Sequence, residues 1–506
     1  MRRPERGVGR SQEVGDMAAR TKVDLLVTAS QVFTMDRDGT VLEPGAVAID
    51  GERLVAVGEP AALHERYEPA SVLTAADHAL LPGLVDTYTH AGHGLVRGLF
   101  HPEHGWPAGR LYWSATSVDW WAAEGALAAL ERTLCGVTTS AVIVGSTPAR
   151  CDEPDYALAV ADAHADAGLR VVVGVGPPDR FFSHLDAPWA GTRWVDGRAR
   201  SVPFTYDDAM AVARDVATSL RARGDDRARA VLAPPYLFGR HVAHRLLPER
   251  FPGPHDAPTL LADAERMREA AAEWGVGLHT HMFAGSVDYA LTHGGAAWVA
   301  DVLGPDVVVA HANGLAPHEV DALGAARVGI AVVPTTHENL WYGLAPMVEL
   351  AAAGARVSVA SDGAAPSRSL DLWRDLASAV WAAWRHHRDQ AVLAPMQALR
   401  SVTSDAATAL GLGDEIGSLE AGKRADVIAV DLRSPHLLPI GSTAYQLVHG
   451  ATGADVAHVI ANGVVLMRDR LPTQLEPEAI RSRALAEARL AFERHGSSDV
   501  ARYRWR

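Results

Sequence analysis

Short apolar runs alternate with longer stretches of helical spacing through the middle of the chain. Stretches such as EGALAALERTL and LADAERMREAAAEWG carry apolar residues three and four positions apart, which is typical of amphipathic helices. The short runs predict buried strands, because they are bounded by turn residues and rich in Val, Ile and Leu. After an opening strand that ends at His90, they lie at residues 138–144, 170–174, 230–233, 276–281, 307–311, 329–333 and 357–360. This alternation predicts an α/β fold, a (β/α)8 TIM barrel over residues 81–412.

The two flanks of the barrel region have a strand pattern of their own. In residues 22–80, the stretches VDLLVTASQVFTMD and AVAIDGERLVAVG alternate β-branched and polar residues around an Asp-Gly turn. Residues 413–475 show the same pattern, with a turn at Asn462-Gly463. Because neither flank is long enough to bury a core alone, we expect them to pair with one another.

Three segments lie outside these patterns. Residues 1–21 are charged and Gly-containing without an apolar run, so they predict a disordered N-terminal extension. Residues 181–200 show little periodicity and predict a loop. Residues 476–506 are rich in Ala, Arg and Glu and predict a C-terminal helix.

Composition narrows the class of partner. Lys and Arg number 47 against 61 Asp and Glu, a net charge of −14, which argues against nucleic acid or an anionic membrane as the partner. The apolar runs are too short to span a membrane. The two cysteines, Cys135 and Cys151, form no disulfide framework, so a reducing cytoplasm is the expected setting. We therefore expect a small-molecule substrate.

Polar side chains with metal-binding chemistry fall at the ends of several predicted strands. Tyr88 and His90 close the opening strand and, at period two, leave it on one face. Later strands end in His279-Thr280-His281, in Ala310-His311-Ala312-Asn313 and in Ser361-Asp362-Gly363. The carboxyl ends of barrel strands meet at one face, where the active groups of such enzymes lie. These residues are thus candidates for one shared site.

The opening strand resembles that of the amidohydrolase superfamily, in its cytosine-deaminase-like and chlorohydrolase-like branch. Pro82-Gly83, His90 and Arg97-Gly98 match the branch in place, and GSLEAGKRADVIAVD matches its second β-rich half. The resemblance implies that His90, His281 and Asp362 bind one divalent metal ion, with His311 contacting water or substrate and Asp362 acting as general base. A metal ion of this kind lowers the pKa of water from 15.7 to about 7. The resemblance also implies that the two flanks, residues 22–80 and 413–475, form one small composite β-sandwich, and that the protein is a homodimer.

Three departures from the branch keep alternatives open, the third being His337, which stands where the branch usually has an asparagine. Tyr88 stands where the branch has its first histidine, leaving a two-histidine, one-carboxylate set that suits zinc or iron(II), with manganese a further alternative. Tyr88 is then a weak ligand, a hydrogen-bond donor to substrate or a plug, and His93 is a candidate replacement ligand. Ala284 stands where deaminases of the branch place a glutamate acid, and either His337 or Glu338 could supply the missing acid.

Aromatic residues predict the walls of the pocket. The candidates are Trp106, Tyr112, Trp113, Tyr236, Trp341 and Tyr342. Flat apolar walls suit a planar or heterocyclic substrate, with Tyr88, Trp113, Tyr236, Glu338 and Trp341 expected to contact it. Packing inside the loops is an equally good interpretation of these aromatic residues.

Three hypotheses for the function follow. The first is a metal-dependent amidohydrolase that hydrolyses a C–N bond, in a deaminase, amidase or chlorohydrolase-like reaction. The second is a non-hydrolytic iron- or manganese-dependent enzyme, an oxidising enzyme or a lyase, on the same barrel. The third is a barrel without metal that binds a ligand without turnover.

Overall fold

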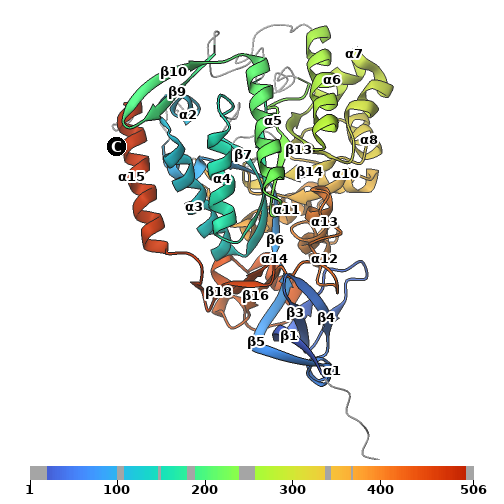
Figure 1. The fold of residues 1–506 in the computed structure, drawn as a ribbon. Coiled ribbons are helices and arrows are strands. Elements are labelled where there is room, and N and C mark those ends of the chain that lie inside the picture. Colours follow the sequence, from blue (N-terminus) through green and yellow to red (C-terminus); the bar gives the residue numbers. More distant parts are fainter. Residues whose placement is uncertain are drawn as a thin grey trace, which may run out of the picture.

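The structure is a computed structural model that describes residues 20–99, 108–145, 150–178, 189–238, 257–336, 343–365 and 368–496. Its helices surround a central sheet, and a separate sheet lies at one end of the molecule (Figure 1). Among the described residues, no helix is both long and apolar enough to cross a lipid bilayer.

The central sheet holds eight strands in the order β15-β14-β13-β12-β11-β8-β7-β6, and all described pairings between them are parallel. The bounds are β6 (Leu84–Ala91), β7 (Val137–Val144), β8 (Arg170–Val175), β11 (Ala228–Leu232), β12 (Leu278–Phe283), β13 (Val307–Asn313), β14 (Gly329–Val332) and β15 (Arg356–Val359). The first and last strands meet just beyond β15, where the Asp362 N–H donates to the Tyr88 carbonyl at 3.0 Å. The predicted barrel is therefore confirmed. Two candidate site residues, Tyr88 and Asp362, lie where the first and last strands meet.

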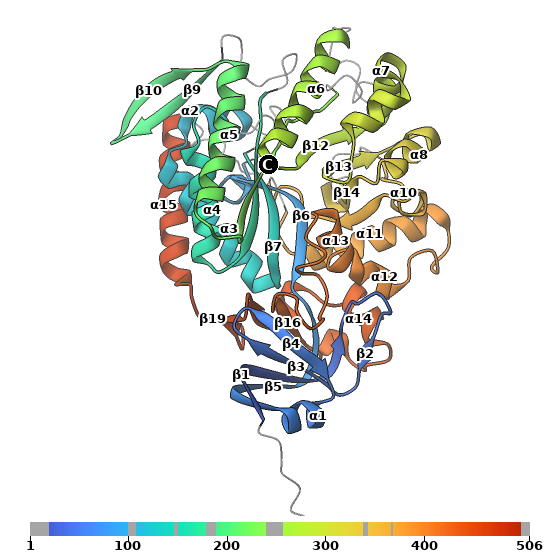
Figure 2. The ribbon, with the colours of Figure 1, turned by 45° about the vertical axis from the view of Figure 1, so that its right-hand side comes forward.

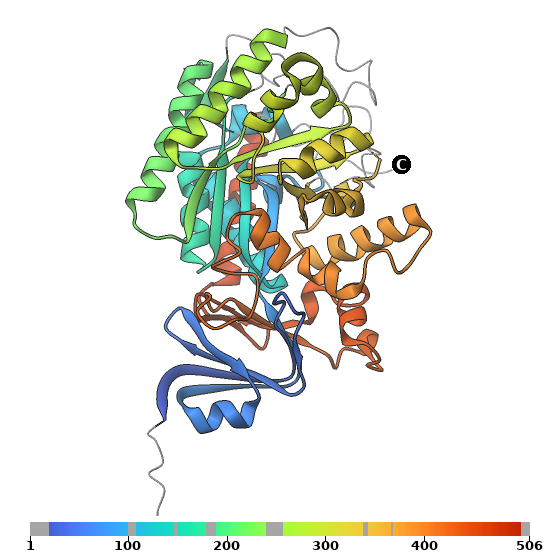
Figure 3. The ribbon, with the colours of Figure 1, turned by 90° about the vertical axis from the view of Figure 1, so that its right-hand side faces the viewer.

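Helices cover the outside of the barrel (Figure 3). They are α2 (Ala108–Ala115), α3 (Val118–Cys135), α4 (Asp155–Asp166), α5 (Tyr206–Ala222), α6 (Ala257–Trp274), α7 (Ser286–Val302), α8 (Pro317–Ala325), α10 (Met347–Ala353), α11 (Leu372–His387), α12 (Pro395–Arg400) and α13 (Ser404–Ala409). Helix α3 shows why they form where they do. The Ser117 side chain caps its first turn, and Gly136 ends it with a left-handed φ of 81°.

The two flanks form one nine-stranded sheet, below the barrel in Figure 2. The N-terminal flank contributes β1 (Thr21–Phe33), β2 (Val41–Leu42), β3 (Gly45–Asp50), β4 (Arg53–Gly58) and β5 (Tyr67–Pro82), with α1 (Pro60–Arg66) against it. The C-terminal flank contributes β16 (Val427–Asp431), β17 (Val456–Ala461), β18 (Val464–Arg468) and β19 (Leu471–Pro472). Strands β5 and β16 pair antiparallel, with Leu81 opposite Ile428. Side chains from both flanks share one apolar core that includes Val27, Leu80 and Ile460, as a composite sandwich requires.

One expectation for the loops is wrong. Part of the segment predicted as a loop forms an antiparallel hairpin, β9 (Ala190–Val195) and β10 (Arg198–Pro203). Asp196 and Gly197 join the strands, with φ angles of 48° and 72°. Asp-Gly is favoured where both central residues of a hairpin turn have positive φ. The Asp196-Gly197 pair therefore indicated a hairpin, although the flanking residues show no clear alternation of apolar and polar positions.

The end of the described chain lies along the barrel wall. Helix α15 (Pro477–His495) packs on α3 and α2, with Ala484 and Ala491 buried beneath it. The remaining short elements are η1 (His93–Val96), α14 (Thr443–His449), η4 (Pro435–Leu437) and η5 (Gly453–Asp455). Of these, η1 follows the opening strand directly and therefore places His93 beside the candidate site.

Candidate active site

His90 and Asp362 meet at the point where the barrel closes. His90 lies near the end of β6, and Asp362 lies just beyond β15. Their exposed fractions are 6% and 5%. The His90 Nδ1–H donates to the Gly145 carbonyl at 2.6 Å, so its Nε2 carries only a lone pair when the ring is neutral. That Nε2 lies 3.3 Å from Asp362 Oδ1. Burial lowers the pKa of His90, against the opposing effect of the Asp362 carboxylate, and so favours the neutral ring.

His281 is held in the same way on β12. Its Nδ1–H donates to the Pro235 carbonyl at 2.8 Å, which directs Nε2 into the site. Its ring lies 5.6 Å from the His90 ring, nearly parallel to it at 14°. Both histidines therefore use Nδ1 for a backbone carbonyl, which is the outer contact that orients metal-binding imidazoles in proteins.

Tyr88 projects from β6 between these groups. Its hydroxyl lies 3.2 Å from His281 Nε2 and 3.3 Å from Nδ1. Because Nδ1–H donates to Pro235, Nε2 is the nitrogen that can accept the Tyr88 proton. Burial, together with the Asp362 carboxylate and Tyr236, raises the pKa of Tyr88 well above its ordinary value. The phenol is therefore a neutral donor in this arrangement. The His281 nitrogen that a metal ion would use is taken by the Tyr88 hydroxyl.

The Asp362 carboxylate is held by Thr336, which follows β14, and by Arg368 of its own segment between β15 and α11. Its Oδ2 accepts from the Thr336 hydroxyl at 2.7 Å and lies 3.6 Å from Arg368 Nη1. Burial by itself would raise the pKa of Asp362, but Arg368, His311, His90 and Thr336 together bring it well below its usual range. Asp362 is thus ionised, with Oδ2 engaged and Oδ1 directed at His90.

His311 reaches the group through an irregular strand end. Its φ is 75° and that of Ala312 is 55°, both left-handed, and the pairing of β12 with β13 shifts register at this point. Such bulges re-aim a side chain at the end of a strand. The His311 ring lies 5.2 Å from the His281 ring and 4.8 Å from that of Phe283. The four residues expected to share a cavity, His90, His281, His311 and Asp362, therefore meet in one buried cluster.

The other predicted site residues have three different outcomes. Tyr236 lies against the cluster, its ring 5.5 Å from that of His281, whereas Trp113 is buried with its ring stacked on Phe204 at 5.3 Å and under the Arg150 guanidinium. The described contacts of Trp113 are those of a packed interior residue, and its role as a pocket wall stays a prediction. Trp106, His337, Glu338, Trp341 and Tyr342 lie outside the described residues.

His93 packs against the His90 ring, and Gly363 packs against His93. The His93 ring stacks on the His90 ring at 5.0 Å, and its Nδ1 accepts from the Ala365 N–H at 3.4 Å. A Cβ on Gly363 would lie 1.7 Å from His93 Nδ1, so only glycine fits there. His93 supports the His90 ring in this structure, and its role as a replacement ligand stays a prediction.

Sequence reasoning missed Thr336 and Arg368. Thr336 follows strand β14 at a predicted strand end, so its place was a usable signal, although threonine is common in loops. Arg368 lies six positions after Asp362 in SDGAAPSRS, and nothing in that stretch distinguishes it. Both residues matter because they hold the one carboxylate of the cluster.

His90, His281 and Asp362 carry the donor types that hold a divalent cation, although their ligand atoms do not all lie within 4.8 Å of one another. His90 Nε2 and Asp362 Oδ1 are both lone-pair acceptors, yet they face each other at 3.3 Å. Two acceptors in contact repel each other unless a cation or proton lies between them. Imidazole and carboxylate donors are those that zinc prefers, with iron(II) and manganese as weaker competitors for such sites.

Comparison with known proteins places the chain in a family. Residues 79–466 match the Amidohydrolase family. The chain belongs to the amidohydrolase family. This amidohydrolase is 31% identical over 458 residues to a 5-methylthioadenosine/S-adenosylhomocysteine deaminase of Moorella thermoacetica, covering 87% of this chain and 94% of that protein. A protein of the same name from Haloarcula marismortui is 28% identical, covering 94% of this chain and 99% of that protein.

Two solved structures share the fold of this amidohydrolase. An adenosine deaminase from Xanthomonas campestris with bound zinc superposes with a TM-score of 0.78 at 23% identity, covering 94% of this chain and 100% of that chain. An atrazine chlorohydrolase from Arthrobacter aurescens TC1 complexed with zinc gives a TM-score of 0.71 at 23% identity, covering 92% and 100%. The resemblance noted in the sequence is therefore confirmed. The chain is a hydrolase of the type that acts on carbon–nitrogen bonds, rather than an oxidising enzyme or a lyase.

Proposed function

We propose that this amidohydrolase uses one divalent metal ion, zinc in the first place, to hydrolyse an exocyclic C–N bond of a small nucleoside-like heterocycle. The observation that carries the proposal is the contact between two acceptors, His90 Nε2 and Asp362 Oδ1, at 3.3 Å. His281 Nε2 supplies the third donor once the Tyr88 hydroxyl gives way. The nucleoside class is proposed because the relatives that cover most of the chain are named as deaminases of adenosine-type compounds.

A bound divalent ion supplies an acidified water molecule at neutral pH. The protein's own residues do the rest. Asp362 would accept the proton of the attacking water, its carboxylate being held in place by Thr336 and Arg368. His311 stands beside His281, where an imidazole can orient the water or bind the oxygen that develops negative charge.

The acid that protonates the heterocycle is the open part of this mechanism. Ala284 offers no proton at the position of the branch's glutamate. The Tyr88 hydroxyl, buried and neutral, is one donor at the cluster, and His337 and Glu338 are the other candidates on the chain. A weaker acid favours substrates whose leaving group needs less protonation, so halogenated and alkylthio heterocycles belong in the assay beside the amines.

The proposal is tested by metal analysis and by turnover of Asp362→Asn. We expect protein purified without chelator to hold about one zinc ion per chain and to release ammonia from adenosine, 5-methylthioadenosine or S-adenosylhomocysteine. Asp362→Asn should lower kcat by at least about 100-fold, because the base is lost, and should lower metal content. Asp288→Asn, on the outer helix α7, is the matched control and should change neither.

Three results separate the hypotheses. Unchanged turnover and metal content in Asp362→Asn would overturn the proposal. A protein that binds nucleosides but holds no metal and shows no turnover would instead be a ligand-binding barrel. Release of chloride but not ammonia from substituted heterocycles would support hydrolysis by a metal-activated water but would show that the substrates are chlorinated heterocycles and not amines.

A further inference from the structure

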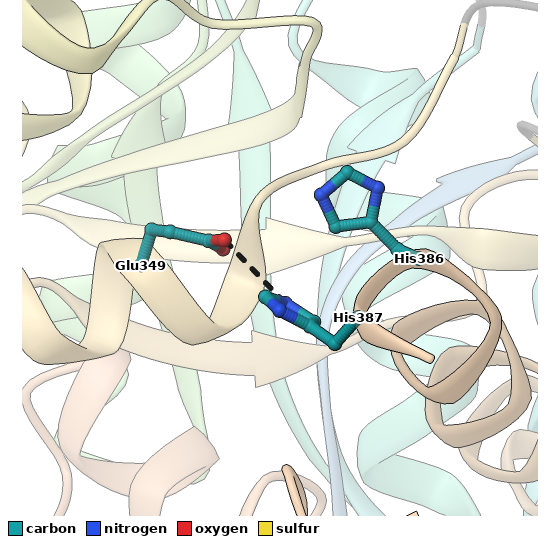
Figure 4. Close-up of side chains that lie close together, drawn as sticks. All are labelled: Glu349, His386 and His387. Atoms are coloured by element: carbon teal, nitrogen blue, oxygen red, sulfur yellow. Dashed lines mark ion pairs between the residues drawn. The ribbon is translucent and has the colours of Figure 1, made fainter. Parts of the chain in front are cut away.

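Three side chains with metal-binding chemistry converge where helix α11 ends against helix α10. Glu349 lies in α10, and His386 and His387 are the last residues of α11. One ligand atom from each side chain lies within 4.8 Å of the other two. His387 Nε2 is 3.4 Å from Glu349 Oε1, and the two imidazole rings lie 4.9 Å apart at 89°. Figure 4 shows the Glu349 carboxylate directed across the gap towards the two rings.

The local backbone explains the convergence. Arg388 adopts a left-handed φ of 55° and stops α11 at His387, so both histidines lie in its last turn. The last turn of a helix carries carbonyl groups without helical partners and the negative end of the helix dipole, which favours a bound cation. Arg385 lies in the same turn and opposes this effect, so the attraction has to come mainly from the three ligands themselves.

An ordinary ion pair between Glu349 and His387 leaves two features without explanation. Glu349 Oε2 is buried and has no hydrogen-bond partner among the described residues, although burying a carboxylate oxygen without a partner is unfavourable. His386 takes no part in the pair, yet its ring faces the same point. The pair of His318 with Asp288, at 3.1 Å, shows how such a surface contact looks without a third ligand.

We propose that Glu349, His386 and His387 form a second metal site, distinct from the barrel cluster and selective for zinc or a similar transition metal. Two imidazoles and one carboxylate suit zinc, nickel or copper, whereas magnesium and calcium prefer oxygen ligands alone. Tetrahedral ligands with bonds of about 2.1 Å lie about 3.4 Å apart. Glu349 Oε1 and His387 Nε2 are already at 3.4 Å, so the remaining approach falls to His386. Rotation of the exposed His386 side chain provides this movement.

A metal ion held by Glu349, His386 and His387 would join helix α10 to helix α11. Glu349 and His387 also border a cavity of about 340 Å³, which is lined mostly by apolar side chains such as Leu344 and Met347. Helix α11 carries Asp375, whose carboxylate accepts from the Thr335 hydroxyl at 2.6 Å, and the next residue, Thr336, bonds to Asp362. The second ion would therefore be a structural clamp between α10 and α11, and the opposite end of α11 contacts the segment that holds the barrel carboxylate.

The test compares zinc uptake of the wild type with that of the double variant His386→Ala, His387→Ala. After loading with zinc and removal of loosely bound ions, the wild type should hold about one zinc ion more per chain than the double variant. Added zinc should raise the Tm of the wild type by more than that of the double variant, which keeps only the barrel site. Glu349→Gln should weaken zinc binding at this site at least about tenfold. His318→Ala, which removes an exposed histidine paired with a carboxylate, is the matched control and should behave as the wild type.

The same comparison in an Asp362→Asn background separates this site from the barrel cluster. In the Asp362→Asn background, chains with His386 and His387 should still hold about one zinc ion more than chains in which both are replaced by alanine. Equal zinc content and equal Tm shifts in the wild type and the double variant would overturn the second site, and so would an equal loss in His318→Ala. Neither result bears on the hydrolytic reaction, which depends on residues at the barrel mouth.

Discussion

Tyr88 stands where the branch has a metal-binding histidine, and in the structure it contacts His281. Its hydroxyl donates to His281 Nε2 at 3.2 Å, and burial keeps the phenol neutral. Of the roles that the sequence left open, a ligand requires an ionised phenol; burial opposes that ionisation, whereas a bound metal ion would favour it. A hydrogen-bond donor that competes with the metal ion for His281 agrees with both observations.

Replacing Tyr88 tests this competition. Tyr88→Phe removes the hydroxyl and keeps the ring, so metal affinity should rise about tenfold, because one hydrogen bond to His281 is no longer lost on binding. Tyr88→His should raise the affinity further by adding a ligand. The measurement is metal competition against a chromophoric chelator, with Tyr156→Phe as a control that removes another buried hydroxyl, bonded to Arg150 at 2.9 Å. A lower affinity in Tyr88→Phe would show that Tyr88 is a ligand.

At the scale of elements, packing between neighbouring helices fixes ionisation states that the sequence does not show. His164 of α4 is buried beside Arg132 of α3. Its Nδ1–H donates to the Val160 carbonyl at 2.8 Å and its Nε2 accepts from Arg132 Nη1 at 3.0 Å, so the ring must be neutral. Burial, with the charge of Arg132, lowers the pKa of His164 to about 3.

This neutral histidine makes stability depend on pH. In the unfolded chain a histidine takes up its proton near pH 6.5, whereas folded His164 stays neutral down to about pH 3. The contribution of His164 is therefore fully present above pH 6.5 and is lost as pH falls towards 3, by up to about 1.4 kcal/mol per pH unit. Urea unfolding between pH 7 and 5 should show a shallower decline in the free energy of unfolding for His164→Gln than for the wild type. An unchanged slope would contradict this assignment, and His318→Gln, exposed, is the control that should keep the wild-type slope.

At the scale of the whole molecule, a buried charge pair joins the barrel to the composite sheet. Arg170, at the start of β8, donates to Asp426 Oδ2 at 2.8 Å, and Asp426 Oδ1 accepts from the Asn462 N–H at 2.8 Å. The Asp426 carbonyl accepts from the Gly83 N–H at 3.0 Å, beside the point where the chain passes from β5 into β6. A Cβ on Gly83 would lie 2.2 Å from the Thr138 hydroxyl, so this passage also needs glycine.

Breaking that junction should destabilise the whole chain. Asp426→Ala leaves the Arg170 guanidinium buried without its partner, which should lower the free energy of unfolding by about 3–5 kcal/mol. Asp306→Ala removes an exposed partner of Arg268, at 2.6 Å, and should cost no more than about 1 kcal/mol. Chemical denaturation of the two variants measures the difference. Similar losses would mean that the buried pair does not hold the two parts together.

The amino-acid pattern alone was enough for the barrel, for the β-rich flanks and for the strand ends that carry His90, His281, His311 and Asp362. These follow from the periodicity of burial and from turn residues, which act between neighbours along the chain. The missed hairpin is the exception, because its strands are too exposed to show a burial pattern.

Only the tertiary structure decided which side chains touch. Tyr88 and His281 are 193 residues apart, and their contact depends on the register at which β6 and β12 enter the barrel. The same holds for Thr336 on Asp362 and for His387 on Glu349. Contacts between distant segments are set to within an ångström by how the strands and helices pack. No local pattern of apolar and polar residues encodes a distance of that kind.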